Sequence, residues 1–129
     1  MNLANATVNT QENWQTVCQA QDLVADSGVV VWFDGAQVAL FYLPGQAQPL
    51  YAVDNRDPRS GANIIGRGLV GSGQGELVVA APLYKQHFSL LSGECLEDAG
   101  QRLRVWPVRL KGEAVELAVA RYPFAACAG

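Results

Sequence analysis

The sequence predicts an all-β domain, an antiparallel β-sandwich or barrel. Short runs of β-branched and aromatic residues alternate along the chain with turns rich in Gly and Pro, which is the pattern of all-β domains. No window sustains the apolar period of an amphipathic helix. Asp34-Gly35 joins two apolar runs directly, and this dipeptide is a strong hairpin signal because a two-residue turn needs positive φ angles.

In the first half of the chain, order is expected to begin at Trp14, after a polar stretch without aromatic residues. The expected strands here cover residues 14–18, 29–33, 38–42 and 50–53. Residues 22–28 form a connection rich in turn-forming residues. The two runs around Asp34-Gly35 are apolar at nearly every position, so we expect both faces of this hairpin to be covered.

In the second half, residues 54–75 are dense in Gly, Arg, Asp and Asn and predict mainly loops. The glycine run at 71–75 lacks the Lys-Ser/Thr of a phosphate-binding loop and precedes a strand, so it indicates a mobile hairpin. Pro107 places its strand at an edge or a bulge. The expected strands in this half cover residues 76–80, 87–90, 104–110 and 114–119, the last two joined by a turn at Lys111-Gly112.

The composition excludes several classes of partner. The chain has 129 residues, 50% of them hydrophobic, and a formal net charge of -3, which fits one domain with a real core. A mildly acidic chain without a Lys/Arg run is a poor partner for nucleic acid or for anionic membrane surfaces. No apolar run approaches the roughly 20 residues that span a bilayer.

The chain is expected to divide into a disordered leader over residues 1–12, a β domain over 13–120 and a C-terminal tail over 121–129. The leader has no basic n-region and no apolar h-region, so it does not read as a secretory signal. An odd number of cysteines without such a signal indicates free thiols in a reducing cytoplasm. These cysteines are Cys18, Cys95 and Cys127.

An ordered series of segments, none decisive alone, carries a resemblance to a known family. The segments cover residues 14–18, 38–41, 52–58, 66–70, 75–83 and 90–98. Together they resemble the small subunit of the cytoplasmic NAD(P)H-dependent assimilatory nitrite reductase. The resemblance implies a Rieske-like fold without a bound cluster. It also implies a large partner subunit that carries FAD, an iron–sulfur cluster and sirohaem, and that reduces nitrite to ammonium.

Two stretches of the chain, residues 54–58 and 81–88, resemble the two ligand loops of a Rieske iron–sulfur site. Such a site needs Cys-x-His in the first loop and Cys-x-x-His in the second, because two thiolates hold one iron and two imidazoles the other. Asn55 and Asp57 occupy the first pair of positions, and Ala81 and Tyr84 occupy the second. The chain has a single histidine, so we expect no metal, no cofactor and no catalytic site in it.

Two interpretations of these loops remain open. In the first, they form a tip that docks on the large subunit. The candidate docking residues are Arg56, Asp57, Arg59, Tyr84 and His87. In the second, polar contacts have replaced the metal only to hold the loops together, for example through a hydrogen bond between Asp57 and the Tyr84 hydroxyl, contributing about 0.5–1.5 kcal/mol. His87 fits a packing or hydrogen-bonding role better than that of a proton donor.

The predicted function is that of a non-catalytic small subunit of nitrite reductase. Two alternatives from other classes are a Rieske-type electron carrier with unusual ligands and a free-standing regulatory module that binds another oxidoreductase. A second basic group follows the loops, and it favours a solvated surface with weak ion pairs over charge complementarity with a partner. Its members are Arg102, Arg104, Arg109 and Lys111.

Overall fold

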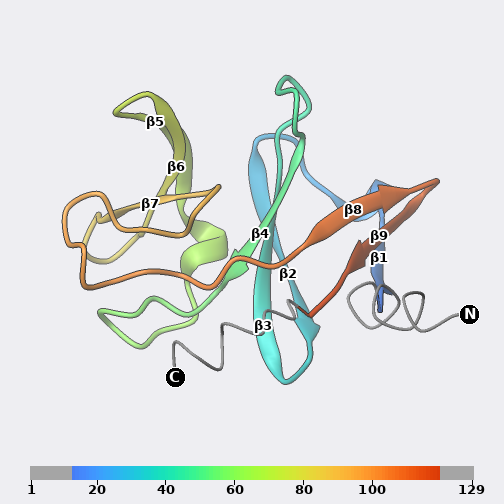
Figure 1. Ribbon diagram of the computed structural model, residues 1–129, viewed down its shortest axis with the longest axis horizontal. Coiled ribbons are helices and arrows are strands. Elements are labelled where there is room, and N and C mark those ends of the chain that lie inside the picture. Colours follow the sequence, from blue (N-terminus) through green and yellow to red (C-terminus); the bar gives the residue numbers. More distant parts are fainter. Residues whose placement is uncertain (1–12, 120–129) are drawn as a thin grey trace, which may run out of the picture.

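The computed structural model describes residues 13–119, which form three antiparallel three-stranded sheets (Figure 1). The sheets have the strand orders β1-β9-β8, β2-β3-β4 and β5-β6-β7. The elements are β1 (Gln15–Gln19), η1 (Ala20–Asp22), β2 (Ser27–Phe33), β3 (Ala36–Tyr42), β4 (Leu50–Asp54), η2 (Ile65–Arg67), β5 (Leu69–Gly73), β6 (Glu76–Ala80), β7 (His87–Ser89), β8 (Val108–Lys111) and β9 (Ala114–Leu117). The all-β prediction is confirmed. The expected leader (1–12) and tail (121–129) lie outside the described residues.

Tight turns join the hairpins where the sequence predicts them. Asp34 and Gly35, between β2 and β3, have φ angles of 52° and 78°, the positive pair that a two-residue turn of this hand requires. Gln74 and Gly75, with φ angles of 52° and 85°, do the same between β5 and β6. The glycine run is therefore a hairpin, as predicted.

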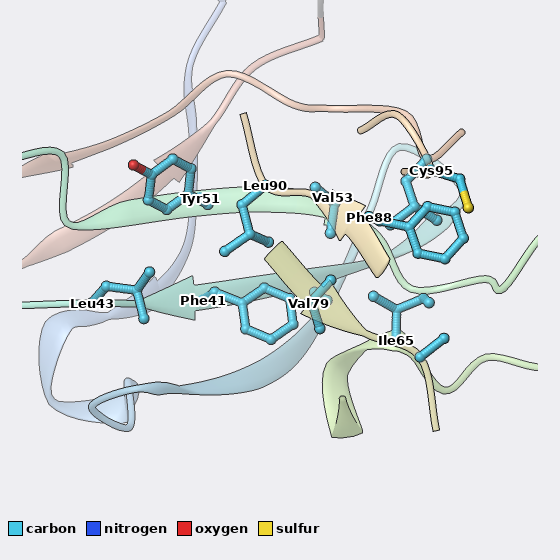
Figure 2. Packing of buried hydrophobic residues seen from close by; sticks show 12 residues of the cluster. Phe41, Leu43, Tyr51, Val53, Ile65, Val79, Phe88, Leu90 and Cys95 are labelled. Atoms are coloured by element: carbon cyan, nitrogen blue, oxygen red, sulfur yellow. The ribbon is translucent and has the colours of Figure 1, made fainter. Parts of the chain in front are cut away.

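The β2–β4 sheet stands between the other two sheets (Figure 1), and both faces of its central strand β3 are buried. Alternate residues of β3 point to opposite faces, so Phe41 enters one apolar cluster and Leu40 enters the other. The first cluster lies under β5–β7 (Figure 2); it includes Phe41, Val53, Val79, Phe88 and Leu90. The second lies under β8 and β9; it includes Leu40, Ala52, Trp106, Val115 and Leu117.

The expectation that both hairpin strands are covered holds for β3 and is wrong for β2. Residues Val38 to Phe41 of β3 are fully buried. On β2, Val29 and Val31 pack against the second cluster, but Val30 and Trp32, which point to the opposite face, remain 46% and 69% exposed. An apolar run in the sequence thus does not show whether both faces of a strand are covered.

The long loop expected over 54–75 contains two elements that the sequence pattern did not indicate, η2 and β5. The strand β5 contains two glycines, and its large apolar residue Leu69 is 78% exposed. Its sequence therefore lacks the alternation of apolar and polar residues that predicts a strand. Gly68, between η2 and β5, lies very close to β6. A Cβ at this position would collide with the Ala80 carbonyl oxygen. This close approach brings the first loop beside the end of β6.

The strand expected over 104–110 begins only at Val108. Pro107 lacks the N–H that a ladder position needs, and β8 lies at the edge of its sheet as predicted. Before Pro107 the chain runs extended beside β4. Trp106 N donates to Ala52 O at 2.9 Å, and Asp54 N donates to Arg104 O at 2.9 Å. No helix in the described part of the chain is long and apolar enough to cross a bilayer.

Candidate functional site

The first loop leaves the end of β4 and is anchored by Asn55, which is 3% exposed. Its Nδ2 donates to Gln37 Oε1 at 2.9 Å, and its Oδ1 accepts the Gly66 N–H at 2.6 Å. A Cβ at Gly66 would lie 2.8 Å from Val30 Cγ2 and 3.1 Å from Asn55 Oδ1, so only glycine fits there without displacement. Both polar atoms of the Asn55 side chain are therefore committed to holding the loop to β3 and η2.

Asp57 shapes the rest of the first loop from a buried position. Its side chain is fully buried, and its Oδ1 accepts the backbone N–H of Arg59 at 2.9 Å. Its own backbone closes the loop, since Asp57 N donates to Ala62 O at 2.8 Å and Gly61 N donates to Asp57 O at 2.7 Å. Among the described residues its Oδ2 has no hydrogen-bond partner. Asp57 positions Arg59 and is not itself available to a partner.

The second loop follows β6 and closes on itself through Ala81. Ala81 N donates to Gln86 O at 2.8 Å, and Lys85 N donates to Ala81 O at 3.0 Å. Lys85 has a φ of 57°, which is uncommon for a residue with a side chain and fixes the reversal of the chain. Ala81 is buried, whereas Tyr84 is 52% exposed. The loop thus presents Tyr84 at the surface.

A stacking contact joins the two loops. The Arg59 guanidinium carbon lies 4.5 Å from the centroid of the Tyr84 ring, within the range of a cation–π interaction. The hydrogen bond considered between Asp57 and the Tyr84 hydroxyl does not form, because Asp57 Oδ1 is held by the Arg59 N–H and Oδ2 has no partner. The two loops are in contact, as the second interpretation assumed, but the contact is between Arg59 and Tyr84 and not between Asp57 and Tyr84.

His87, the remaining candidate docking residue, is engaged within the chain. Its Nδ1 lies 2.6 Å from Glu97 Oε2, and its backbone N–H donates to Glu97 Oε1 at 2.8 Å. Desolvation raises the pKa of Glu97, but the hydrogen bonds and charge of His87 outweigh it, so the pKa is lowered overall. Burial is the main reason that the pKa of the neighbouring Cys95 thiol is raised. The geometry favours the hydrogen-bonding role for His87.

The surface at the two loops is basic and partly apolar. Between residues 55 and 86 the acidic residues are Asp57, which is buried, and Glu76, which starts β6 at its opposite end. The exposed basic and large apolar side chains around the loops are Arg56, Arg59, Arg67, Lys85, Leu69, Leu83 and Tyr84. The sequence analysis did not single out Leu69, Leu83 and Lys85. The excess of basic over acidic residues across this segment could have indicated Lys85, but no pattern in the sequence indicates the two leucines.

Comparisons with known proteins agree with this geometry. Residues 13–118 match the family of Rieske-like 2Fe-2S domains. A curated relative, the nitrite reductase (NADH) small subunit of Salmonella typhimurium, is 38% identical over 104 residues, which are 81% of this chain and 95% of that one. The chain belongs to the family of nitrite reductase small subunits. This resolves the fold class as Rieske-like and confirms the resemblance found in the sequence.

Two further relatives of the family are informative. The crystal structure of a putative NADH-dependent nitrite reductase small subunit from Mycobacterium tuberculosis is 38% identical and covers 84% of this chain and 96% of that chain, with a TM-score of 0.77. A Klebsiella oxytoca protein named the large subunit of nitrite reductase [NAD(P)H] is 36% identical over 102 residues, which are 79% of this chain and 10% of that protein. A domain of this family therefore also occurs within a much longer chain.

The residues at the four ligand positions do not fit the iron–sulfur cluster that the Rieske-like family implies. Asn55 uses both side-chain polar atoms for protein contacts, and Ala81 has no ligand atom. Tyr84 lies at the surface against Arg59, and Asp57 supplies one carboxylate where an imidazole is needed. The described residues contain no group of three or more His, Cys, Asp or Glu side chains arranged to hold a metal ion.

Proposed function

We propose that this chain is the non-catalytic small subunit of a cytoplasmic NAD(P)H nitrite reductase that converts nitrite to ammonium in nitrate assimilation. It would assemble with a large subunit that carries FAD, an iron–sulfur cluster and sirohaem. The observation that supports an assembly role most directly is the use of the four former ligand positions for loop structure rather than for metal. The Klebsiella oxytoca relative supports it further, because a related domain there is part of the protein named the large subunit.

The surface that would meet the large subunit is the end of the two loops. The loops are held in one arrangement before binding, because Asp57 fixes the Arg59 backbone and Arg59 stacks on Tyr84. Preorganisation of this kind reduces the entropy lost on association. Of the five candidate docking residues, we assign direct contact to Arg56, Arg59 and Tyr84, whose side chains are exposed. Asp57 and His87 would act within the chain.

A partner that binds only the folded, active form of the large subunit stabilises that form. Reconstitution tests this role directly. The large subunit is purified with and without this chain, and both its rate of NADH-dependent nitrite reduction and its thermal stability are measured. We expect the complex to exceed the isolated large subunit in at least one of the two. Full rate and full stability of the large subunit alone would refute the assembly role.

The docking surface is tested separately with Arg59→Glu and Tyr84→Ala. We expect each to weaken binding to the large subunit about tenfold or more. Arg59→Glu does so because charge reversal opposes a complementary surface, and Tyr84→Ala because it removes an exposed aromatic side chain of the kind that dominates binding energy at interfaces. Lys111→Glu makes the same charge change as Arg59→Glu at the exposed end of β8 and serves as the control. An absorption spectrum of anaerobically purified protein addresses the electron-carrier alternative: visible bands with stoichiometric iron would favour that carrier.

A further inference from the structure

A groove of about 1080 Å³ runs along the extended connection between β7 and β8. Its lining includes Leu91 and Ser92, which follow β7, and Trp14, which precedes β1. The connection itself supplies Arg102, Arg104 and neighbouring residues. Figure 1 shows this connection, in orange, passing in front of β4 between the two outer sheets. Asp54, the last residue of β4, lines the groove, but no residue from 55 to 86 does, so the groove is distinct from the surface of the two loops.

The backbone of the connection offers an open edge at Val105, which lines the groove. Val105 pairs with Val53 of β4 as an isolated antiparallel bridge, and the hydrogen bonds that make the bridge belong to the residues on either side. In a pair of this type the N–H and C=O of the central residue point away from the partner strand. Among the described residues neither group of Val105 has a backbone partner. An extended segment can add at such an edge.

The charges of the groove select an acidic occupant. Arg102 and Arg104 line it and are exposed, while Asp54 is the one acidic residue of its lining in the described chain. Asp54 Oδ1 already accepts the Trp106 indole N–H at 2.9 Å and faces Arg104 Nε at 3.4 Å. Arg102 donates a hydrogen bond to Ser92 O at 3.0 Å, and among the described residues it forms no ion pair with a carboxylate. Glu94 lies opposite Arg102 in a β-bridge of the backbone, but it does not line the groove. The lining is therefore net positive.

An apolar anchor completes the groove. Leu91, which lines the groove, is 67% exposed, and such a side chain gains from burial against a partner's apolar residue. Another part of the lining is held in place, since Arg104 stacks over Trp106 with its guanidinium carbon 4.1 Å from the ring centroid. A fixed floor, a free backbone edge, a basic rim and one apolar anchor together match an extended peptide that carries both acidic and apolar side chains.

We propose that this groove binds an extended acidic segment of the nitrite reductase large subunit, which pairs with the backbone of Val105 and places a carboxylate against Arg102 and an apolar side chain against Leu91. The proposal rests on the proposed function for the identity of the partner. It adds a second contact surface, so that the large subunit would hold this domain both at its two loops and along its side.

The experiment measures the affinity of the full chain for the purified large subunit by titration calorimetry. The groove variants are Arg102→Glu and Leu91→Ala, both at exposed side chains, with Lys111→Glu as the matched charge control. We expect Arg102→Glu to weaken binding about tenfold or more and to reduce its dependence on salt. Leu91→Ala is expected to weaken it about fivefold, and Lys111→Glu less than about twofold. Circular dichroism establishes that each variant is folded.

The three tryptophans supply an independent readout by indole N–H resonances. Trp14 and Trp106 line the groove, whereas Trp32 is exposed on β2 and does not. Occupation of the groove is expected to shift the first two signals and to leave the third unchanged. Unchanged affinity in both groove variants, or a shift confined to Trp32, overturns the groove proposal while the wild type still binds. Failure of the wild-type chain to bind the large subunit at all overturns the proposed function instead.

Discussion

Arg59 and Tyr84 stack with 4.5 Å between the guanidinium carbon and the ring centroid, and this contact joins two loops that a metal cluster joins in Rieske domains. Each loop is first closed by its own backbone hydrogen bonds, around Asp57 in one and around Ala81 in the other. The stacking pair then fixes the loops relative to each other. The connection is an exposed side-chain contact instead of a buried set of metal bonds.

The strength of this connection is open to a double-mutant cycle with Arg59→Ala and Tyr84→Leu. We expect the two substitutions to be coupled by about 0.5–1 kcal/mol of unfolding free energy, the range for an exposed cation–π pair. Urea denaturation of the wild type, both single variants and the double variant measures the coupling. Strict additivity would mean that the loops are held by their backbones alone.

Asn55→Ala is expected to lower the free energy of unfolding by about 1–3 kcal/mol, because it leaves the buried Gly66 N–H without its acceptor. The Gln37 side-chain oxygen loses its donor as well. Asn63→Ala is the matched control, since Asn63 is exposed in the same loop, and a change within about 0.5 kcal/mol is expected there. Chemical denaturation measures both. Equal effects at the two sites would contradict the anchoring role of Asn55.

Gly93→Ala is expected to destabilise the fold by more than about 2 kcal/mol. Gly93 has a φ of 84°, and a Cβ there would collide with the Leu103 carbonyl oxygen. Gly35→Ala separates the two causes, because Gly35 has a φ of 78° but nothing within 4 Å of its Cβ position. That variant carries only the backbone strain, about 1 kcal/mol. Thermal melts that rank the two variants in the opposite order would contradict the packing at Gly93.

The His87–Glu97 pair predicts a pH dependence of stability with a defined sign. The pKa of Glu97 is lowered in the folded state from its usual value of 4.5. Its contribution is therefore fully present above pH 4.5 and is lost as the pH falls through the folded pKa. Glu97→Gln removes the charge but keeps an acceptor for the His87 N–H. Because the pair is half exposed, we expect a difference of at most about 1 kcal/mol at pH 7.

The measurement for this pair is urea denaturation of the wild type and Glu97→Gln between pH 3 and pH 7. The two stability curves should converge as the pH falls below 4.5, the usual pKa of the carboxyl. Curves that stay parallel over the whole range would show that the charge of Glu97 contributes nothing to the fold. Divergence toward low pH would mean that the sign of its pKa shift is wrong.

The strands were predictable where local chemistry decides the structure. The Asp34-Gly35 turn and the runs beside it appear in the structure within a few residues of the expected bounds, because a two-residue hairpin is specified by the residues in it. Burial was less predictable. Whether Trp32 is covered depends on what packs against its face of β2, and that is a property of the whole fold and not of the run itself.

The candidate site was predictable in its loops and not in its side-chain contacts. The positions of Asn55, Asp57, Ala81 and Tyr84 followed from the family resemblance. The partners of these residues did not, since Gln37 and Gly66 are 18 and 11 residues away from Asn55 in sequence and neither stands out in a pattern. The contact between Glu97 and His87 was likewise not predictable, because only the pairing of β7 with the 94–97 segment brings the two side chains together.

The bonds of Asn55 also bear on how this lineage can change. A cysteine at position 55 would leave the Gly66 N–H without its acceptor and the Gln37 side-chain oxygen without its donor. It would hold no iron–sulfur cluster until three other ligands were also present. The first of the four substitutions would therefore cost stability without any gain in metal binding. The hydrogen bonds of this one side chain thus oppose the stepwise acquisition of a cluster by this chain.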